Sequence, residues 1–551
     1  MGVYVHLLVR RYLTTRIIPL IAVGAVALCV ALVIVVVSVM SGFLDSLRSS
    51  GRTLMGDVVV SVSIQGIPYY EELIADIERL PGAAAAAPLL DTYGLVKMPY
   101  PEGSRKSIQQ AQVWGIEPES LARVTEFRDT IWWKPASSAA EAMRMGSDDP
   151  RRTLDDTLLK DALAMRDRAT GRPGAMLGIH VSQANERQRD GSYRPYRPQW
   201  WMPNNEITVT LVPVSETGKI AEPRSAVFKV VNEVMSGVYQ VDKARVFIPL
   251  KEAQEMVRMD AAPVYDLTVE PDADGRRPLR GMSPARVTQI LVRAKPGVTP
   301  RELRDEVATA YEQFYLRKSA DPSALSKPSP PDVVGIETWE QRLRELIGPV
   351  EKERQMMRIL FSITYVVCAG LILAIFWSIV GEKTRDIGIM RAMGAGRGGV
   401  MMIFLRYGLV IGVVGSAVGT LVGWVVIRNI NTIHEAMGHD APPWLWGGTF
   451  LLALGSAALA VRGAVRGGAL PFLLWSVATL ALVGTGVGLC LHRGFLIWDP
   501  AVYYFTQIPS RMDWETALGT SIGAIVFSVL GAAVPAARAA DIDPVRALRY
   551  E

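Results

Sequence analysis

The sequence has few of the residues that carry chemistry in enzymes. It holds three cysteines and five histidines among 551 residues. The cysteines, Cys29, Cys368 and Cys490, all lie inside apolar runs, so no disulfide is expected to staple the polar middle of the chain. The scarcity of histidine and the lack of Cys/His clusters argue against a metal site. No grouping suited to nucleophilic catalysis is present either.

A phosphate-binding loop is also missing. The pattern G-x-x-x-x-G-K-[ST] does not occur, and the nearest fragment, TGKI at residues 217–220, lacks the upstream glycine and the following Ser or Thr. The sequence therefore predicts a chain that is not an enzyme and that binds no cofactor or metal of its own.

Long apolar runs are what the chain does contain. Half of the residues are hydrophobic, and they gather in blocks of about 20 residues, the length that crosses a bilayer core. These blocks hold no aspartate, glutamate or lysine, which argues against an ion-coupled carrier. The block at residues 17–40 is too long for a signal peptide and predicts an uncleaved first span. Five further spans are expected, at residues 359–380, 401–427, 444–461, 469–491 and 517–534, and the sequence leaves open whether 444–491 is a true transmembrane hairpin.

The distribution of positive charge orients these spans. With the N-terminus inside, twelve lysines and arginines fall in the short inside segments and three in the short outside segments, in agreement with the positive-inside rule. The large polar segment then lies outside the cytoplasm. The predicted parts are an N-terminal segment with the first span, an extracytoplasmic domain and a permease domain, at residues 1–40, 41–356 and 357–551.

The polar segment mixes the patterns of strands and helices. Strands are expected at residues 56–63, 207–213, 225–234 and 244–249, and helices at residues 69–80 and 299–318. Thr299 and Pro300 form a start signal for the second helix. Because no regular βαβ rhythm appears, the polar segment is expected to be an α+β domain rather than a doubly wound α/β domain. The expected fold class of the whole chain is an α-helical membrane protein. Its large α+β extracytoplasmic domain is inserted between the first and second transmembrane helices.

One short stretch between the second and third spans is unusual. It reads EKTRDIGIMRAMGAGRGG, at residues 382–399, and its apolar residues Ile387, Met390 and Met393 recur at helical spacing. The pattern predicts a short amphipathic helix at the bilayer surface. The glycines that follow allow a tight turn into the next helix. The simpler alternative is a solvated loop that only anchors the two spans.

The third span carries small residues four positions apart. Such spacing lets helices approach closely in lipid. The alternatives are packing within one subunit and an interface between subunits. The helix-packing residues are Gly408, Gly412, Gly415, Gly419 and Gly423.

Four stretches together resemble one family. They are RRYLTTR with the following span, the stretch 382–399 with the glycine-rich span that follows it, WDPAVYYFTQIPSRMDW before the last span, and the ending PAARAADIDPVRALRYE. The chain resembles the permease subunits of lipoprotein-releasing ABC transporters, of the LolC/LolE type. These are related to the MacB efflux pumps and the FtsX division proteins. The resemblance implies a mechanotransmission permease of the inner membrane that extracts lipoproteins from the outer leaflet.

The resemblance also implies partners. They are a dimeric cytoplasmic ABC ATPase that supplies ATP and Mg²⁺, a second permease copy or a paralogue, membrane lipids and a periplasmic lipoprotein carrier, with no nucleic acid. In this family the loop at residues 381–399 docks on the ATPase. The residues expected to couple to it are Glu382, Lys383, Arg385, Asp386, Ile387, Arg391, Gly394 and Arg397.

A loop of the outer domain grips the carrier in one permease type. The matching loop here is residues 213–224, where Lys219, Pro223 and Arg224 are the expected contacts, with a plain β-turn as the alternative.

Two features depart from the family pattern. They are the added apolar pair at residues 444–491 and an insertion around residues 129–205, whose role the sequence does not reveal. Within the insertion, the aromatic and arginine-rich stretch 190–205 predicts either a packed surface loop or a contact surface. The alternatives to lipoprotein release are a MacB-like efflux permease for peptides or amphiphiles and an FtsX-like regulator of a cell-wall hydrolase.

Overall fold

The structure is a computed structural model of the 551-residue chain. The expected inside segment 1–16 and the expected carrier contact Lys219 lie outside the described residues. The described residues are 17–62, 65–100, 107–136, 138, 149–182, 184–188, 193–196, 200–214, 220–265, 278–438, 442–465, 469–491 and 507–543.

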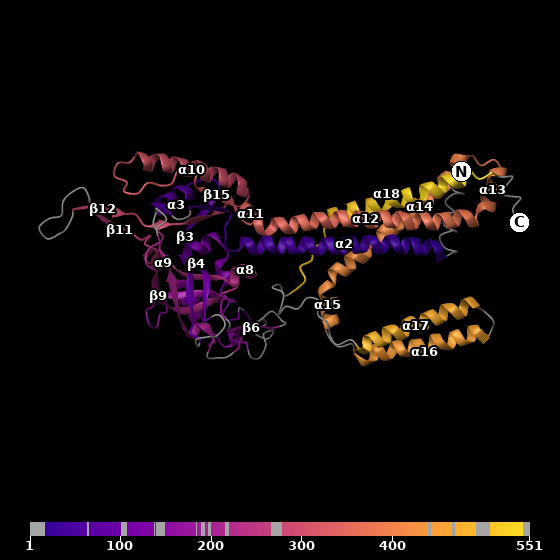
Figure 1. The fold of residues 1–551 in the computed structure, drawn as a ribbon, viewed down its shortest axis with the longest axis horizontal. Coiled ribbons are helices and arrows are strands. Elements are labelled where there is room, and N and C mark those ends of the chain that lie inside the picture. The colour runs from indigo at the N-terminus through magenta and orange to yellow at the C-terminus, as the bar shows by residue number, and fades with distance from the viewer. Residues whose placement is uncertain are drawn as a thin grey trace. The chain divides into compact units, whose positions relative to one another are not determined.

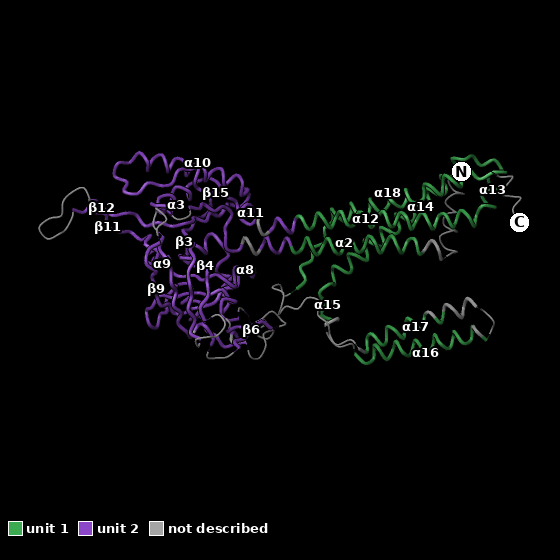
Figure 2. Tube along the Cα trace, in the orientation of Figure 1, with its two compact units in different colours: residues 1–43, 352–503, 507–551 green, residues 44–351, 504–506 purple. Residues whose placement is uncertain are grey.

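The chain forms two compact units (Figure 2). One unit is built from Leu44–Glu351. The other contains the described residues before and after that segment. The helices α2 (Ile17–Arg52) and α12 (Arg344–Glu382) each contribute residues to both units.

The polar unit is organised by a nine-stranded sheet, with the order β15-β1-β14-β3-β4-β10-β5-β9-β8. The β10–β4 and β5–β9 pairs are parallel and the others are antiparallel. The strands are β1 (Val58–Ser61), β3 (Ala83–Lys97), β4 (Ile108–Ile116), β5 (Gly174–Gly178), β8 (Glu206–Leu211), β9 (Arg224–Val234), β10 (Arg245–Pro249), β14 (Gln289–Ala294) and β15 (Gly335–Thr338). Three small two-stranded pairs are formed by β2 (Ile67–Pro68) with β13 (Arg286–Val287), β6 (Asn185–Arg187) with β7 (Tyr193–Pro195), and β11 (Ala262–Tyr265) with β12 (Leu279–Ser283).

The long strand β3 has three neighbours. Its residues 83–89 pair with β14, residues 89–97 pair with β4, and residues 94–97 also pair with β8. The last pairing closes β3-β4-β10-β5-β9-β8 into a ring. Gly94 is needed at the closure, because a Cβ atom there would lie 2.6 Å from the Thr210 carbonyl oxygen.

Helices cover the sheet (Figure 1). The helix α10 (Pro300–Ala320) begins with a capping box in which the Thr299 side chain accepts from the Glu302 N–H and the Glu302 side chain accepts from the Thr299 N–H. Its Leu303, Val307 and Phe314 are buried in the main core. The remaining helices of this unit are α3 (Tyr70–Glu78), α4 (Pro118–Val124), α5 (Phe127–Thr130), η1 (Pro150–Arg152), α7 (Thr157–Ala164), η3 (Met202–Asn204), α8 (Tyr239–Asp242), α9 (Leu250–Val257) and α11 (Trp339–Arg342).

The expected α+β class is confirmed, and each expected strand and helix overlaps one that is observed. The bounds differ by a few residues: β1 occupies Val58–Ser61, and α3 occupies Tyr70–Glu78. Within the described part of the expected insertion, Trp133 and Tyr193 are fully buried, so the insertion is packed against the domain at these two points. The packed-loop interpretation therefore holds for Tyr193 and Met202, which are buried parts of the stretch 190–205.

A buried carboxylate holds this insertion to the sheet. Glu233 of β9 is completely buried and accepts from Trp133 Nε1 at 2.6 Å and from Asn185 Nδ2 at 2.8 Å. Ser182 Oγ donates to it more weakly, at 3.4 Å. Burial raises the pKa of Glu233 from 4.5 to about 7, against the lowering effect of these hydrogen bonds.

The second unit contains the apolar helices. Five described helices are long and apolar enough to cross a membrane, and the described residues Ala478–Cys490 form a shorter apolar helix within α17. A hydrogen bond links α16 (Pro443–Val465) and α17 (Ala469–Leu491), the added apolar pair, because Ser456 Oγ and Thr479 Oγ1 lie 2.9 Å apart. Besides α2 and α12, the helices are α13 (Thr384–Ala392), α14 (Arg397–Arg428), α15 (Ile430–Gly438), α16 (Pro443–Val465), α17 (Ala469–Leu491) and α18 (Trp514–Ala540).

Candidate functional site

The expected coupling stretch forms the helix α13, which links the long helices α12 and α14 (Figure 1). α13 occupies Thr384–Ala392 and follows directly on α12. The chain leaves it through Gly394, whose φ of +97° belongs to the left-handed region that glycine adopts without strain. A short helix between two tight bends is a compact body attached to both neighbouring spans.

One face of α13 is anchored in the apolar core of its unit. Ile387 is 1% exposed and belongs to the same cluster as Val400, Phe404 and Ala536. Met390 packs against this cluster. This side of α13 is therefore packed against residues near the ends of α14 and α18.

Arg391 ties α13 to the end of α18. Its guanidinium Nη1 donates to the carbonyl oxygens of Ala540 and Ile542, the latter at 3.1 Å. The last carbonyls of a helix lack intrahelical partners and carry partial negative charge, so a cation there is favourable. Arg391 therefore forms a contact within the chain, and the contact with the ATPase that was expected from the sequence stays a prediction.

The opposite face of α13 is open. Arg385 is exposed, and Ile389 and Met393, at spacings of four, are 41% and 75% exposed. Residues at these spacings lie on one side of a helix. We call Arg385, Ile389 and Met393 the outer face of α13. Ile389 had not been singled out from the sequence, although it lies four residues after Arg385.

The other expected coupling residues lie around the two bends. Lys383 Nζ lies 2.7 Å from Asp386 Oδ2, an ion pair within the helix. Arg397 Nη1 lies 3.9 Å from Asp541 Oδ1, and both side chains are more than 70% exposed. Glu382, at the end of α12, is exposed. These charged side chains lie beside the outer face of α13.

The five glycines of α14 serve two neighbouring helices within the chain. A Cβ atom on Gly412 would lie 2.9 Å from Ile525 Cα of α18, and Gly408 faces Ala532 of the same helix. A Cβ atom on Gly419 would lie 2.5 Å from the Ala27 carbonyl oxygen of α2. Gly415 and Gly423 also face α2, at Val26 and Ile34. The stripe therefore brings α14 into backbone contact with both α2 and α18.

A polar cluster joins three helices at the other end of the apolar unit. Asp513 caps α18 by accepting from the Thr516 N–H at 3.1 Å. Its carboxylate also accepts from Arg354 of α12 at 2.5 Å and from Ser41 of α2 at 3.5 Å. Burial raises the pKa of Asp513, but the hydrogen bonds from Thr516 and the charge of Arg354 outweigh it and lower the pKa below its usual value. Sequence reasoning missed this cluster, although Asp before an apolar helical run is an N-cap signal.

The expected carrier loop is described in part. Pro223 and Arg224 lie at the start of β9, and the Arg224 guanidinium donates to the Glu255 carbonyl oxygen at 2.7 Å. Val214 and Ile220 form an isolated antiparallel bridge across the loop. Over the described ranges, no group of three or more histidine, cysteine, aspartate or glutamate side chains is arranged to hold a metal ion.

Comparison with known proteins defines the class of this chain. Residues 358–468 match the family "FtsX-like permease C-terminal". This segment begins in α12, contains α13 and α14, and reaches α16. Together with the five apolar helices, the match indicates a multi-pass membrane protein with a large α+β domain and a segment similar to FtsX-like permeases.

Relatives that cover most of the chain narrow this class. The chain is 22% identical over 529 residues to the lipoprotein-releasing system transmembrane protein LolC of Xylella fastidiosa, covering 96% of this chain and 92% of that protein. It is 23% identical over 425 residues to LolC of Neisseria meningitidis, covering 76% and 80%. To LolE of Haemophilus influenzae it is 21% identical over 218 residues, 40% of each chain. These similarities support a LolC/LolE-type ABC permease.

Proposed function

We propose that the chain is the membrane subunit of an ATP-driven transporter that extracts lipoproteins from the outer leaflet of the inner membrane. In this proposal the lipoprotein passes to a periplasmic carrier and does not cross the membrane. The observation that carries the proposal is the similarity to LolC, which extends over almost the whole chain. The matched length includes the polar unit as well as the apolar unit.

Force enters through α13 in this proposal. A cytoplasmic ABC ATPase, acting as a dimer with ATP and Mg²⁺, docks on the outer face, where Arg385 supplies charge and Ile389 and Met393 supply apolar contact. Lys383, Asp386 and Arg397 surround that contact. Arg391 acts inside the chain by holding α13 to α18, so that displacement of α13 moves α18 with it. Such a subunit needs no catalytic residue of its own.

The membrane arrangement follows from the same proposal. The unit Leu44–Glu351 lies in the periplasm as an insertion between the first and second spans, and the apolar unit lies in the inner membrane. A second permease copy or a LolE-like paralogue completes the transporter. The loop between β8 and β9, with Pro223 and Arg224, contacts the carrier.

Reconstitution tests this function. The chain and its cognate ATPase are placed in proteoliposomes with a triacylated lipoprotein, and ATP-dependent release to a soluble carrier is measured. We expect release in the presence of ATP and none when the ATPase carries an inactive catalytic site. ATPase activity without release would reject lipoprotein extraction in favour of efflux or hydrolase control, which a pull-down with a periplasmic hydrolase then separates.

A further inference from the structure

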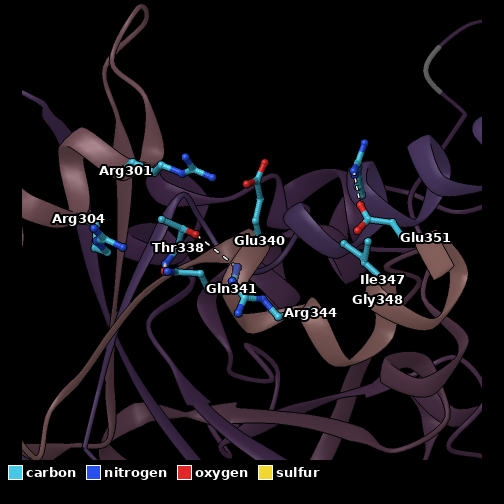
Figure 3. A pocket seen from close by; sticks show the side chains of 10 residues that line it. Arg301, Arg304, Thr338, Glu340, Gln341, Arg344, Ile347, Gly348 and Glu351 are labelled. Atoms are coloured by element: carbon cyan, nitrogen blue, oxygen red, sulfur yellow. Dashed lines mark hydrogen bonds and ion pairs between the residues drawn. The ribbon is translucent and has the colours of Figure 1, made fainter. Parts of the chain in front are cut away.

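The polar unit contains a pocket lined by arginines (Figure 3). Its volume is about 410 Å³. Residues of α2, α10, α11 and α12 line it together. The lining residues are Arg48, Arg301, Arg304, Thr338, Glu340, Gln341, Arg344, Ile347, Gly348 and Glu351.

Positive charge is in excess in this pocket, with four arginines against two glutamates. Arg48 is paired with Glu351 at 2.7 Å, and Arg304 is paired with its neighbour Asp305 at 2.7 Å. No described side chain forms a hydrogen bond or ion pair with Arg301 or Arg344. Two guanidinium groups are therefore available for a ligand, and Glu340 is the one carboxylate of the lining without a described partner.

The acceptor oxygens of the neutral polar side chains in the pocket are already used. The Thr338 side chain accepts from the Gln341 N–H, and the Gln341 side chain accepts from the Thr338 N–H, which completes a capping box. A ligand that seeks a neutral acceptor, such as a sugar hydroxyl or an amide N–H, would compete with this capping box. The chemistry that remains is that of guanidinium groups, which bind phosphate through two parallel hydrogen bonds.

The pocket also lies at the ends of two membrane-crossing segments. The helix segments with a candidate span are Ile21–Ser49, which contains Arg48, and Ile347–Glu382, which begins at a lining residue, and their apolar runs are residues 17–40 and 359–380. Arg344 precedes the second segment by three residues. The lining residues of α2 and α12 therefore lie beyond the apolar runs on the side of the polar unit, next to the layer of lipid headgroups, where phosphate is abundant.

We propose that this pocket binds the phosphate of an anionic phospholipid headgroup, through Arg301 and Arg344. Arg48 and Arg304 add positive potential without being released from their partners. A lipid held there would fix the level at which α2 and α12 enter the membrane. The proposal depends on the chain being a membrane protein and not on the cargo that it handles.

Calorimetry with two soluble probes tests this site. The full chain in a non-ionic detergent is titrated with dihexanoyl-phosphatidylglycerol and, separately, with inorganic phosphate. The pocket variant is Arg301→Gln with Arg344→Gln. The matched control is Arg128→Gln with Arg280→Gln, which removes two exposed arginines from the same unit outside the pocket. Thermal unfolding of both variants checks that they fold.

We expect the pocket variant to bind the lipid about 30-fold more weakly and the control to bind like the natural chain, since each surface arginine contributes about a factor of five to attraction of an anionic lipid. Arg344→Lys alone should weaken binding by less, because it keeps the positive charge and loses only the two parallel N–H donors of the guanidinium group. Equal lipid binding by all four proteins would overturn the site. Inorganic phosphate that binds the natural chain as tightly as the lipid would overturn the lipid assignment.

Discussion

Arg354 of α12 and Asp513 at the start of α18 form a charged hydrogen bond, with Nη2 2.5 Å from Oδ2. The two side chains are 25% and 16% exposed, so water screens the pair less than a surface pair. The carboxylate also caps α18 and accepts from Ser41 of α2. One aspartate thereby couples three helices that are distant in the sequence.

This relationship predicts an energetic coupling between the two residues. Arg354→Gln and Asp513→Asn should each destabilise the chain, and the double variant should cost about 1–2 kcal/mol less than the sum of the two. Unfolding of the four proteins in detergent micelles measures this difference. Strict additivity would show that the pair contributes no coupling. Asp513→Asn keeps an N-cap on α18, because asparagine caps a helix about as well as aspartate, so this variant tests the charge of the pair rather than the cap.

Substitutions of two arginines of α13 should have different effects, one on ATPase binding and the other on thermal stability. Arg385→Glu should weaken binding of the ATPase and leave thermal stability unchanged, because Arg385 is exposed on the outer face. Arg391→Gln should lower the melting temperature by a few degrees, because the end carbonyls of α18 lose a cationic partner. Pull-down of the ATPase and thermal unfolding, measured on both variants, separate the two roles. A normal melting temperature for Arg391→Gln would contradict its role within the chain.

The glycine stripe makes a prediction about α14. Ala is usually better than Gly inside a helix by about 1 kcal/mol. Gly419→Ala should nevertheless destabilise the chain by roughly 1–3 kcal/mol, because its Cβ would meet the α2 backbone at 2.5 Å. Gly447→Ala in α16 is the matched control, since nothing lies within 4 Å of its Cβ position, and it should be neutral or stabilising. Similar effects of both substitutions would show that α2 and α14 are not in close contact.

The buried carboxylate of β9 predicts a pH dependence of folding. Because the pKa of Glu233 is raised in the folded chain, the folded state holds its proton more tightly than the unfolded state does. Stability from this group is therefore complete below pH 4.5 and falls as pH rises to about 7, by up to about 3 kcal/mol. Glu233→Gln should remove this slope, whereas Glu186→Gln, at an exposed position of β6, should retain it. Thermal unfolding between pH 4.5 and 8 measures both, and an unchanged slope in Glu233→Gln would refute the assignment.

Local patterns predicted those parts of the fold that depend on near neighbours. The start of α10 at Thr299-Pro300 and the apolar spans could be predicted, because helix caps and apolar runs depend only on residues that are adjacent in the sequence. Strand β3 was not, since its run of alanines and Pro88 lack the alternation of a half-buried strand. That strand is held by three neighbours, and tertiary pairing overrides its weak propensity.

In the candidate site too, local patterns predicted the features that depend on near neighbours and missed those that depend on distant residues. The helical spacing of Ile387 and Met390 correctly indicated the anchored side of α13, whereas Met393, the third residue of that pattern, is 75% exposed on the outer face. The partner of Arg391 lies about 150 residues along the chain, and Arg354 and Asp513 are 159 residues apart, so neither pair leaves a local signal. Charge alone therefore could not tell an arginine that faces solvent from one that closes a helix end.

The ring in the polar unit has a consequence for how this unit meets other molecules. Since β8 is paired on both sides, β15 is the free edge of the nine-stranded sheet as far as the chain is described, and it is four residues long. A long unpaired edge invites other chains to extend the sheet. Here an incoming peptide would find only a few main-chain groups to pair with, next to the start of α11. Proteins that bind at this edge of the sheet are then expected to be recognised by side chains and shape, which can distinguish one partner from another without extending the sheet from chain to chain.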